Sequence, residues 1–254
     1  MFGFRIWNDG VLGCSWLAVA TIATVPFCVE LSHGGQLSVD PISLEMGAPA
    51  AAGTLTLKNN DNAEAAVQTR VFRWTQVDGK ERLEPTSDVV ASPPAVKLAP
   101  AADYIVRVVR VSKQPVIGEE SYRIVIDQLP DLRRRNSRAV NLLIRQSIPI
   151  FFQNEQFSAP KVAWSLGYEG PDLVVTATNA GDQRLRIASL TLRDSRGMTI
   201  GFGNGLQGYV LGRSSMKWKA PNHRRDFGAG GAVSITAVTD KGPVGAAVNL
   251  PVPQ

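Results

Sequence analysis

The sequence predicts an all-β protein built from two β-sandwich modules in series. From Gln36 onward the chain consists of short segments in which apolar and polar residues alternate, separated by turns rich in Gly, Pro, Asn and Asp. In the later part of the chain these segments recur about every eight to twelve residues, which is the spacing of strands in a β-sandwich. A length of 254 residues with 44% hydrophobic content suits two domains of about 100 residues each. No stretch shows helical periodicity of useful length.

The first 35 residues differ from the rest of the chain. They contain one basic residue, Arg5, followed by an apolar run from Val11 to Val29. This pattern predicts a secretory signal over residues 1–35, and an uncleaved membrane anchor remains the alternative because the run is near the length that spans a bilayer. Both cysteines, Cys14 and Cys28, fall in this leader. We therefore expect no disulfide within the folded part, whose stability must come from its core.

The first predicted module covers residues 36–153. The segments GTLTLKNND (Gly53 to Asp61) and AAVQTRVFRW (Ala65 to Trp74) alternate as strands do, and the second leads into the turn VDGK. Two further strands, Tyr122 to Gln128 and Val140 to Phe152, are expected to form a hairpin about the loop LPDLRRRNSRA. This hairpin closes the module.

The second predicted module covers residues 161–254, after the polar connector QNEQFSAP. No internal repeat relates it closely to the first module. Its expected strands lie near Val162 to Tyr168, Asp172 to Asn179, Leu185 to Asp194, Tyr209 to Leu211, Ser214 to Lys219, Ala232 to Asp240 and Ala246 to Leu250.

Residues that could carry out catalysis or hold a metal are few. The chain has two histidines, His33 and His223, and neither has a second ligand at metal-binding spacing. The glycine-rich stretch GFGNGLQG (Gly201 to Gly208) is followed by no helix that could bind a phosphate, so it predicts a turn between strands. The adjacent acids Glu119 and Glu120 are expected in a loop with nothing to tune their pKa. We predict that the protein is not an enzyme, has no cofactor or metal and takes no small-molecule substrate.

The charge pattern also argues against nucleic acid as a partner. The 27 basic and 22 acidic residues give a net charge of +5 and are evenly mixed along the chain. Four arginines, Arg133, Arg134, Arg135 and Arg138, gather in the hairpin loop, but no aromatic residue interrupts them as a stacking platform for bases. The loop is interpreted as a solvated hairpin tip that could steer an acidic partner.

The long strand from Val140 to Phe152 has an unusual combination of features. Its even-numbered positions are aliphatic or aromatic with one exception, Gln146, so one face is continuous hydrocarbon. That face would ordinarily point into the sandwich. Pro149 cannot donate to a ladder, which indicates that at least one flank of the strand is an edge. An open apolar edge is the place where another chain can add a strand.

Several of these segments together resemble a known family. In order they are LSVDPISLEM, TLTLKNND, the stretch VQTRVFRWTQVDGKERLEPTSDVVASPPAVKLAP, VRVVRV, EESYRIVIDQLP and AVNLLIRQSIPIFF, which span about residues 36 to 152. The series resembles the N-terminal domain of the periplasmic pilus-assembly chaperones of chaperone-usher systems, in the archaic branch associated with spore-coat-U proteins. The part of the chain after residue 152 agrees in length and β character.

The resemblance implies two immunoglobulin-like domains in a boomerang arrangement that stabilise an incomplete pilin-like or spore-coat-U-like subunit in the periplasm. By donor-strand complementation, the last strand of the first domain would insert its side chains into the subunit's groove. Those residues would be Val140, Leu142 and Ile144, with Gln146 next in line. An outer-membrane usher would then receive the subunit.

The chain departs from the better-known branch of this family where the subunit's C-terminal carboxylate is held. A basic pair occupies those places in that branch, whereas Ser43 and Pro149 stand there in this chain. Arg70, which shares strand parity with Phe72 and Trp74, and Arg145 are candidates to bind the carboxylate instead.

An exported immunoglobulin-like adhesion or carbohydrate-binding module is the alternative function. Such a module would expose aromatic side chains on its loops. Trp74, Trp164 and Trp218 lie in or at the ends of predicted strands, where core packing is expected instead.

Overall fold

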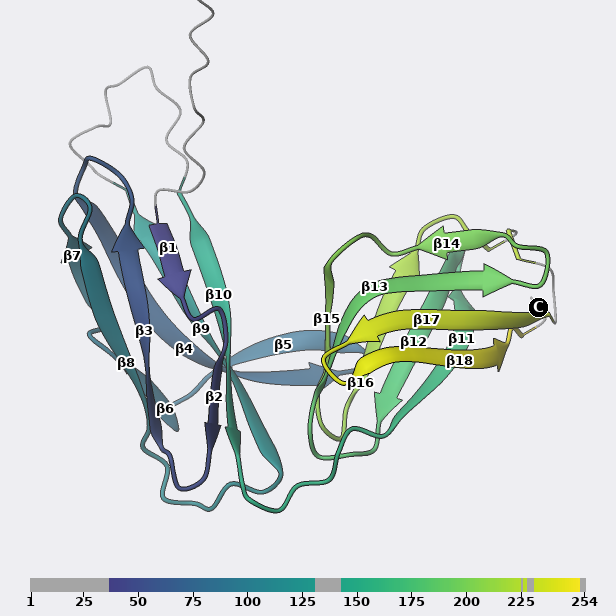
Figure 1. The fold of residues 1–254 in the computed structure, drawn as a ribbon, viewed down its shortest axis with the longest axis horizontal. Coiled ribbons are helices and arrows are strands. Elements are labelled where there is room, and N and C mark those ends of the chain that lie inside the picture. The colour runs from purple at the N-terminus through teal and green to yellow at the C-terminus, as the bar shows by residue number, and fades with distance from the viewer. Residues whose placement is uncertain (1–36, 131–142, 225, 228–230, 252–254) are drawn as a thin grey trace, which may run out of the picture. The chain divides into compact units, whose positions relative to one another are not determined.

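The computed structural model describes residues 37–130, 143–224, 226–227 and 231–251 of the chain, and every regular element in these ranges is a β-strand. The strands of the described residues form four sheets (Figure 1). The leader and the arginine loop of residues 133–138 lie outside the described residues.

Two sheets make up the first sandwich. One has the order β1-β3-β8-β6 and the other the order β2-β10-β9-β4-β5, with β7 paired to β4 (Figure 1). Their bounds are β1 Leu37–Asp40, β2 Leu44–Gly47, β3 Ala52–Asn59, β4 Ala65–Val77, β5 Lys80–Pro85, β6 Val89–Ser92, β7 Ala95–Leu98, β8 Asp103–Arg110, β9 Glu119–Leu129 and β10 Arg145–Gln153.

The other two sheets make up the second sandwich. The smaller has the order β11-β12-β16, and the larger has the order β14-β13-β17-β18 with β15 paired to β13. Their bounds are β11 Val162–Glu169, β12 Asp172–Asn179, β13 Leu185–Asp194, β14 Thr199–Gly201, β15 Leu206–Val210, β16 Ser215–Ala220, β17 Ala232–Thr239 and β18 Gly242–Asn249.

Each sandwich is filled by the inward-facing residues of its alternating strands. Leu55 and Leu57 of β3 meet Ile124 and Ile126 of β9 in the first core, and all four side chains are fully buried. In the second core, Leu173 and Val175 of β12 pack in the same cluster as Ile187 of β13. The alternation read from the sequence is therefore what produces the two cores.

The two strands with which the described residues begin lie in different sheets of the first sandwich. β1 pairs antiparallel with β3, whereas β2 pairs in parallel with the end of β10. Pro41 lies between them and has no N–H to continue the first ladder. The chain therefore leaves one sheet at Asp40 and enters the other at Leu44.

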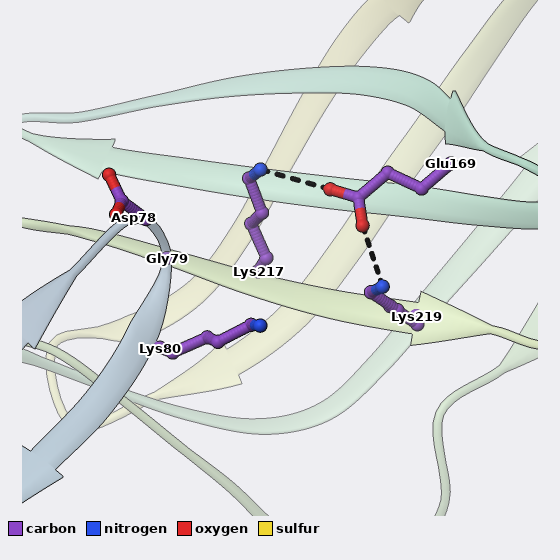
Figure 2. A pocket seen from close by; sticks show the side chains of 6 residues that line it. All are labelled: Asp78, Gly79, Lys80, Glu169, Lys217 and Lys219. Carbon is purple, nitrogen blue, oxygen red and sulfur yellow. Dashed lines mark hydrogen bonds and ion pairs between the residues drawn. The ribbon is translucent and has the colours of Figure 1, made fainter.

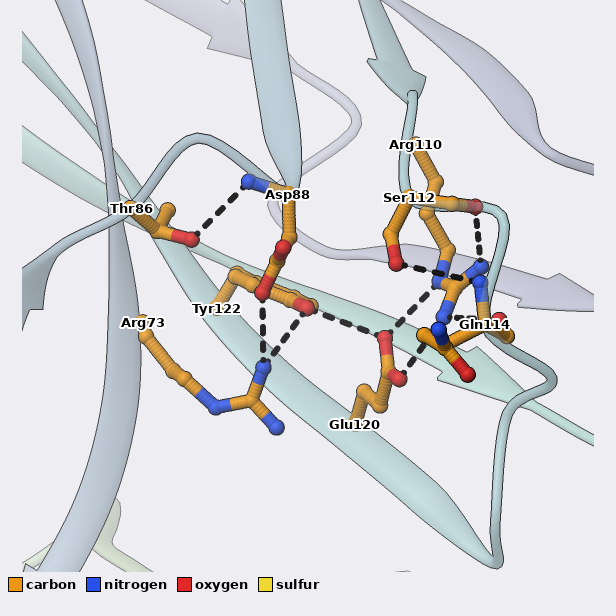
Figure 3. Close-up of polar contacts among 8 residues, drawn as sticks. All are labelled: Arg73, Thr86, Asp88, Arg110, Ser112, Gln114, Glu120 and Tyr122. Atoms are coloured by element: carbon orange, nitrogen blue, oxygen red, sulfur yellow. Dashed lines mark hydrogen bonds and ion pairs between the residues drawn. The ribbon is translucent and has the colours of Figure 1, made fainter.

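A polar network fixes the loop between β8 and β9 (Figure 3). Arg110 donates to both carboxylate oxygens of Glu120, each at 2.9 Å, and to the backbone carbonyls of Ser112 and Gln114. Burial raises the pKa of Glu120, but hydrogen bonds from Arg110 and Tyr122 outweigh it and hold that pKa below its ordinary value. Glu120 and its neighbour Glu119 thus begin β9 and each binds an arginine, which corrects the expectation that they lie in a loop with no partner.

Four side chains drawn from both sandwiches form a separate buried cluster. Trp74 and Phe151 come from the first sandwich, and Tyr209 and Leu211 from the second. The amide of Gln76 donates to the carbonyl of Tyr209 at 2.7 Å and accepts from the N–H of Leu211 at 2.9 Å. A side chain here completes hydrogen bonds that a neighbouring strand would otherwise make.

Candidate functional site

Strand β10 has two neighbours at one end and a single neighbour at the other. It pairs antiparallel with β9 along its whole length, from Arg145 to Gln153. Its pairing with β2 covers only Ile150 to Gln153. Among the described residues, Arg145–Pro149 has no second strand beside it. We call this stretch of edge the open flank.

One hydrogen bond shows which backbone groups face the open flank. The N–H of Gln128 donates to the carbonyl of Ile144 at 2.9 Å. In an antiparallel ladder this places the N–H and C=O groups of even-numbered β10 residues toward β9 and those of odd-numbered residues toward the other side. Arg145 and Ser147 therefore direct their backbone groups to the open flank. Pro149 is also odd-numbered, so the N–H that it lacks would have pointed to this flank and not into the ladder with β9.

The even-numbered apolar side chains of the predicted strand do not all lie in the same environment, because some are buried in the protein's own core and others lie at its margin. Ile148, Ile150 and Phe152 are buried in the first core, which corrects the expectation of a continuous open edge. Ile144 is half-buried. Val140 and Leu142, the other residues expected to bind a subunit, lie outside the described residues.

Gln146 stands at the boundary between these two parts. Its side chain is half-buried, and its amide donates to the backbone carbonyl of Leu37 at 2.7 Å. Leu37 belongs to β1 in the opposite sheet, so this bond joins the two sheets across the edge of the sandwich. The amide is thus used within the protein itself.

The two candidate arginines, Arg70 and Arg145, lie on the outer face of the sheet and bind the same carboxylate. Arg70 donates to one oxygen of Asp127 at 2.6 Å, and Nε of Arg145 donates to the other. Burial raises the pKa of Asp127, but the hydrogen bonds from Arg145 and Arg70 outweigh it, so that the pKa lies below its ordinary value. The structure therefore brings the two candidates together.

The parity expected for Arg70 is also found. The Arg70 guanidinium lies 5.6 Å from the centre of the Phe72 ring, on the same face of β4. Trp74, the next residue of that parity, is buried in the cluster with Phe151. Arg70 is thus held beside an aromatic ring at the outer end of this face.

At the two places where the better-known branch has its basic pair, the structure has no cation. Ser43 is half-buried just before β2, and Pro149 is buried. Directly opposite Pro149 in the ladder is Arg123, whose guanidinium lies 3.8 Å from the centre of the Trp74 ring and donates to Glu81 at 3.4 Å. Burial lowers the pKa of Arg123.

A second arginine near this region belongs to the second sandwich. Arg184 is almost fully buried, donates to Glu119 and Glu45, and stacks 3.5 Å from the centre of the Phe151 ring. Sequence reasoning missed Arg123 and Arg184. Arg184 stands in an ordinary polar turn far along the chain, and only tertiary contacts give it these partners.

The remaining sequence features have structural explanations. His223 contacts Asp226 at 2.5 Å in a turn, and the glycine-rich stretch connects β14 to β15. Trp74 and Trp218 are buried, and Trp164 stacks on Trp218 with ring centres 6.2 Å apart. These tryptophans pack as core residues and form no exposed aromatic cluster of the kind that a carbohydrate-binding module would need.

A small surface pocket is lined by charged side chains from both sandwiches (Figure 2). Glu169 binds Lys217 at 3.0 Å and Lys219 at 2.6 Å, and these two lysines lower its pKa to about 2. Lys80 and Asp78 complete the rim. The lysine charges are already balanced in part by Glu169, and the group is solvated.

A metal site or a membrane-spanning helix in the described ranges would be a further candidate for function. There, no group of three or more His, Cys, Asp or Glu side chains is placed to hold a metal ion. Nor does that part of the chain contain a helix of the length and apolar character needed to cross a bilayer.

Fold and site together define a class of protein. The chain is a tandem pair of immunoglobulin-like sandwiches in which the last strand of the first sandwich keeps one flank partly open. Residues 36–157 match the model of the pili and flagellar-assembly chaperone family, PapD N-terminal domain. This match assigns the first sandwich to the pilus-assembly chaperone family.

Solved structures agree with this assignment at the level of fold. A chain of the pre-assembly complex of the chaperone CsuC and the tip adhesion subunit CsuE, from the archaic chaperone-usher Csu pili of Acinetobacter baumannii, is 21% identical and superposes with a TM-score of 0.65 over 87% of this chain and 100% of its own. The chaperone YadV is 15% identical, with a TM-score of 0.59 over 85% and 100%. A chain of the SafA pilin and SafB chaperone complex of Salmonella enterica is 20% identical, with a TM-score of 0.56 over 83% and 95%. No curated protein matches the sequence.

Proposed function

We propose that the protein is a periplasmic chaperone that stabilises pilin-like subunits by donor-strand complementation and delivers them for assembly at the outer membrane. The observation that carries this proposal is the open flank of β10, next to a family match that covers its whole domain. A subunit that lacks one strand would pair with this flank and receive the side chains that precede it.

The open flank supplies two kinds of interaction. Arg145 and Ser147 offer backbone N–H and C=O groups, and Pro149 offers a carbonyl, to a strand laid along the edge. Val140, Leu142 and Ile144 would bury their side chains in the subunit, at about 1.5 to 3 kcal/mol each before the costs of ordering are subtracted. The sum is enough to retain a subunit and still allow exchange with a better-fitting strand.

Three finer features belong to the same proposal. Residues 1–35 act as the export signal, an outer-membrane usher receives the loaded chaperone, and the system is of the archaic, spore-coat-U-associated kind. The likeness to the CsuC–CsuE complex supports the last of these, and the replacement of the basic pair by Ser43 and Pro149 agrees with it. The carboxylate of the subunit is held by Arg145, alone or with Arg70.

The decisive experiment is co-expression with an exported subunit encoded beside the chaperone gene. The double variant Leu142→Asp, Ile144→Asp should fold as the wild type does and lose the subunit on purification. Ile105→Asp is the matched control, because Ile105 is an isoleucine that is 63% exposed on β8 in the other sheet. Equal recovery of the subunit with the double variant and the wild type would refute the proposal.

A further inference from the structure

Asp127 and its two arginines lie across three neighbouring strands beside the open flank. Arg70 comes from β4, Asp127 from β9 and Arg145 from β10. Asp127 stands directly opposite Arg145 in the ladder. A shallow depression in the surface here is lined by these three side chains together with Gln68, Leu129 and Leu143.

The three side chains differ sharply in exposure. Arg145 is 70% exposed and Arg70 is 45% exposed, whereas Asp127 is only 13% exposed. Asp127 accepts one hydrogen bond on each carboxylate oxygen, so neither guanidinium forms a bidentate pair with it. Arg145 is thus held to Asp127 by a single hydrogen bond, and most of its side chain is exposed to solvent.

Position in the sheet gives Arg145 two directions in which to bind a carboxylate. Its present partner lies on β9, on one side. A strand added along the open flank would lie at the usual spacing of about 4.8 Å on the other side. A terminal carboxylate on that strand would meet Arg145 from the side opposite Asp127. If Arg145 rotated toward it, Asp127 would keep its bond to Arg70 and would not be left buried without a partner.

We propose that Asp127 holds Arg145 away from the open flank in the free protein, and that Arg145 rotates to the terminal carboxylate of an incoming strand while Arg70 stays on Asp127. This proposal rests on the proposed function, since it specifies how the subunit's carboxylate is held. Asp127 is therefore a positioning residue. Arg145 binds the Asp127 carboxylate in the free protein and exchanges it for the subunit's terminal carboxylate when the subunit binds. Arg70 serves as the permanent partner of Asp127.

Binding of two synthetic peptides to the purified protein tests the exchange. Both carry the same soluble sequence of alternating valine and threonine, and one ends in a free carboxylate while the other ends in an amide. Asp127→Asn should bind the carboxylate peptide about tenfold more tightly than wild type and the amide peptide equally, because a charge-assisted bond no longer competes. Equal or weaker binding of the carboxylate peptide by Asp127→Asn would overturn the proposal.

A second pair of variants separates the roles of the arginines. Arg70→Gln should weaken binding of the carboxylate peptide, because Asp127 then holds Arg145 alone. Adding Arg70→Gln to Asp127→Asn should have no further effect. A further loss in the double variant would show that Arg70 itself binds the peptide, and the assigned division of roles would be wrong.

Failure of the proposed function gives a different result. Arg145→Gln should abolish the preference for the carboxylate peptide. If the preference survives, Arg145 is not the anchor, and if the wild type binds neither peptide, the open flank does not accept a strand. NMR of the Arg145 Nε–H group gives an independent readout, because its signal should shift when the carboxylate peptide binds and stay in place with the amide peptide.

Discussion

The two halves of β10 share one partner and differ in the other. From Ile150 to Gln153 the strand lies between β9 and β2, and its inward side chains are buried in the first core. From Arg145 to Pro149 it has β9 alone among the described residues, although Ile148 in this stretch is still buried in the first core. The difference shows that a single strand can belong to the protein's own core at one end and be available to another chain at its other end.

The cause of this difference lies in the first strand of the domain. A strand running parallel to β10 would place the residues before Leu44 beside Pro149 and the positions preceding it. Those residues instead cross to the opposite sheet, where β1 pairs with β3. The break at Pro41 therefore leaves the flank open, and the bond from Gln146 to Leu37 joins the sheets across the gap.

The largest effect should come from placing a charge in the half of β10 that lies between β9 and β2. Ile150→Asp buries a carboxylate without a partner in the first core, so it should destabilise the fold by more than about 4 kcal/mol. Urea unfolding followed by circular dichroism measures this. Ile144→Asp, at the margin, should cost less than about 1 kcal/mol. Similar losses for both variants would mean that the two halves do not differ as described.

Proline substitution sharpens the same comparison at the level of the backbone. The N–H of Ser147 points to the open flank, so Ser147→Pro should leave stability nearly unchanged and weaken subunit binding by about 1 kcal/mol, the contribution of one hydrogen bond. The N–H of Gln146 points to β9, so Gln146→Pro should destabilise the fold itself by about 2 kcal/mol. Subunit pull-down and urea unfolding together measure both effects. Reversed effects would contradict the assigned direction of these N–H groups.

Substitution of Gln146, which stands at the boundary between the two parts of β10, should have a smaller effect. Gln146→Ala removes the bond to Leu37 and leaves a partly buried carbonyl without its donor, which should cost about 1 kcal/mol of folding stability. Gln146→Glu tests whether the donor is what matters, because a carboxylate cannot donate to a carbonyl. Retention of full stability in Gln146→Glu would show that this hydrogen bond does not join the sheets.

The smallest effect is the pH dependence of the Asp127 cluster. The pKa of Asp127 is lowered in the folded protein from an ordinary value of 3.8. Its ionised form is therefore favoured by folding, so the contribution is present at neutral pH and is lost as the pH falls below 3.8 and through the folded pKa. The difference in stability between wild type and Asp127→Asn should shrink over this acid range in parallel melting experiments. A difference that grows on acidification would contradict the sign.

The sequence predicted many strands closely because their signals are local. β12 and β13 occupy the ranges expected from alternation, and the turn between β4 and β5 forms at Asp78 and Gly79, both of which have positive φ. β14, only three residues long, had no pattern to reveal it. The predicted module limits, 36–153 and 161–254, stay predictions, as do the subunit contacts of Val140, Leu142, Ile144 and Gln146.

The site was only partly predictable for a related reason. The parity of Arg70 with Phe72 and Trp74 follows from the alternation along one strand. That Arg70 and Arg145 bind one aspartate depends on the order of three strands, and Arg184 reaches Glu45 and Glu119 only because distant segments meet. Pairings between segments far apart in the chain leave no signal at either position in a single sequence.

By itself the sequence determined that this chain forms β-strands, where most of them lie, and which side of each is apolar, because turn residues and two-residue alternation act over short distances. Tertiary structure alone decided which half of β10 has a neighbouring strand on both sides. That outcome depends on the sheet in which residues 37–43 find their partner, and hydrogen bonds and buried area summed over the whole sandwich settle this choice.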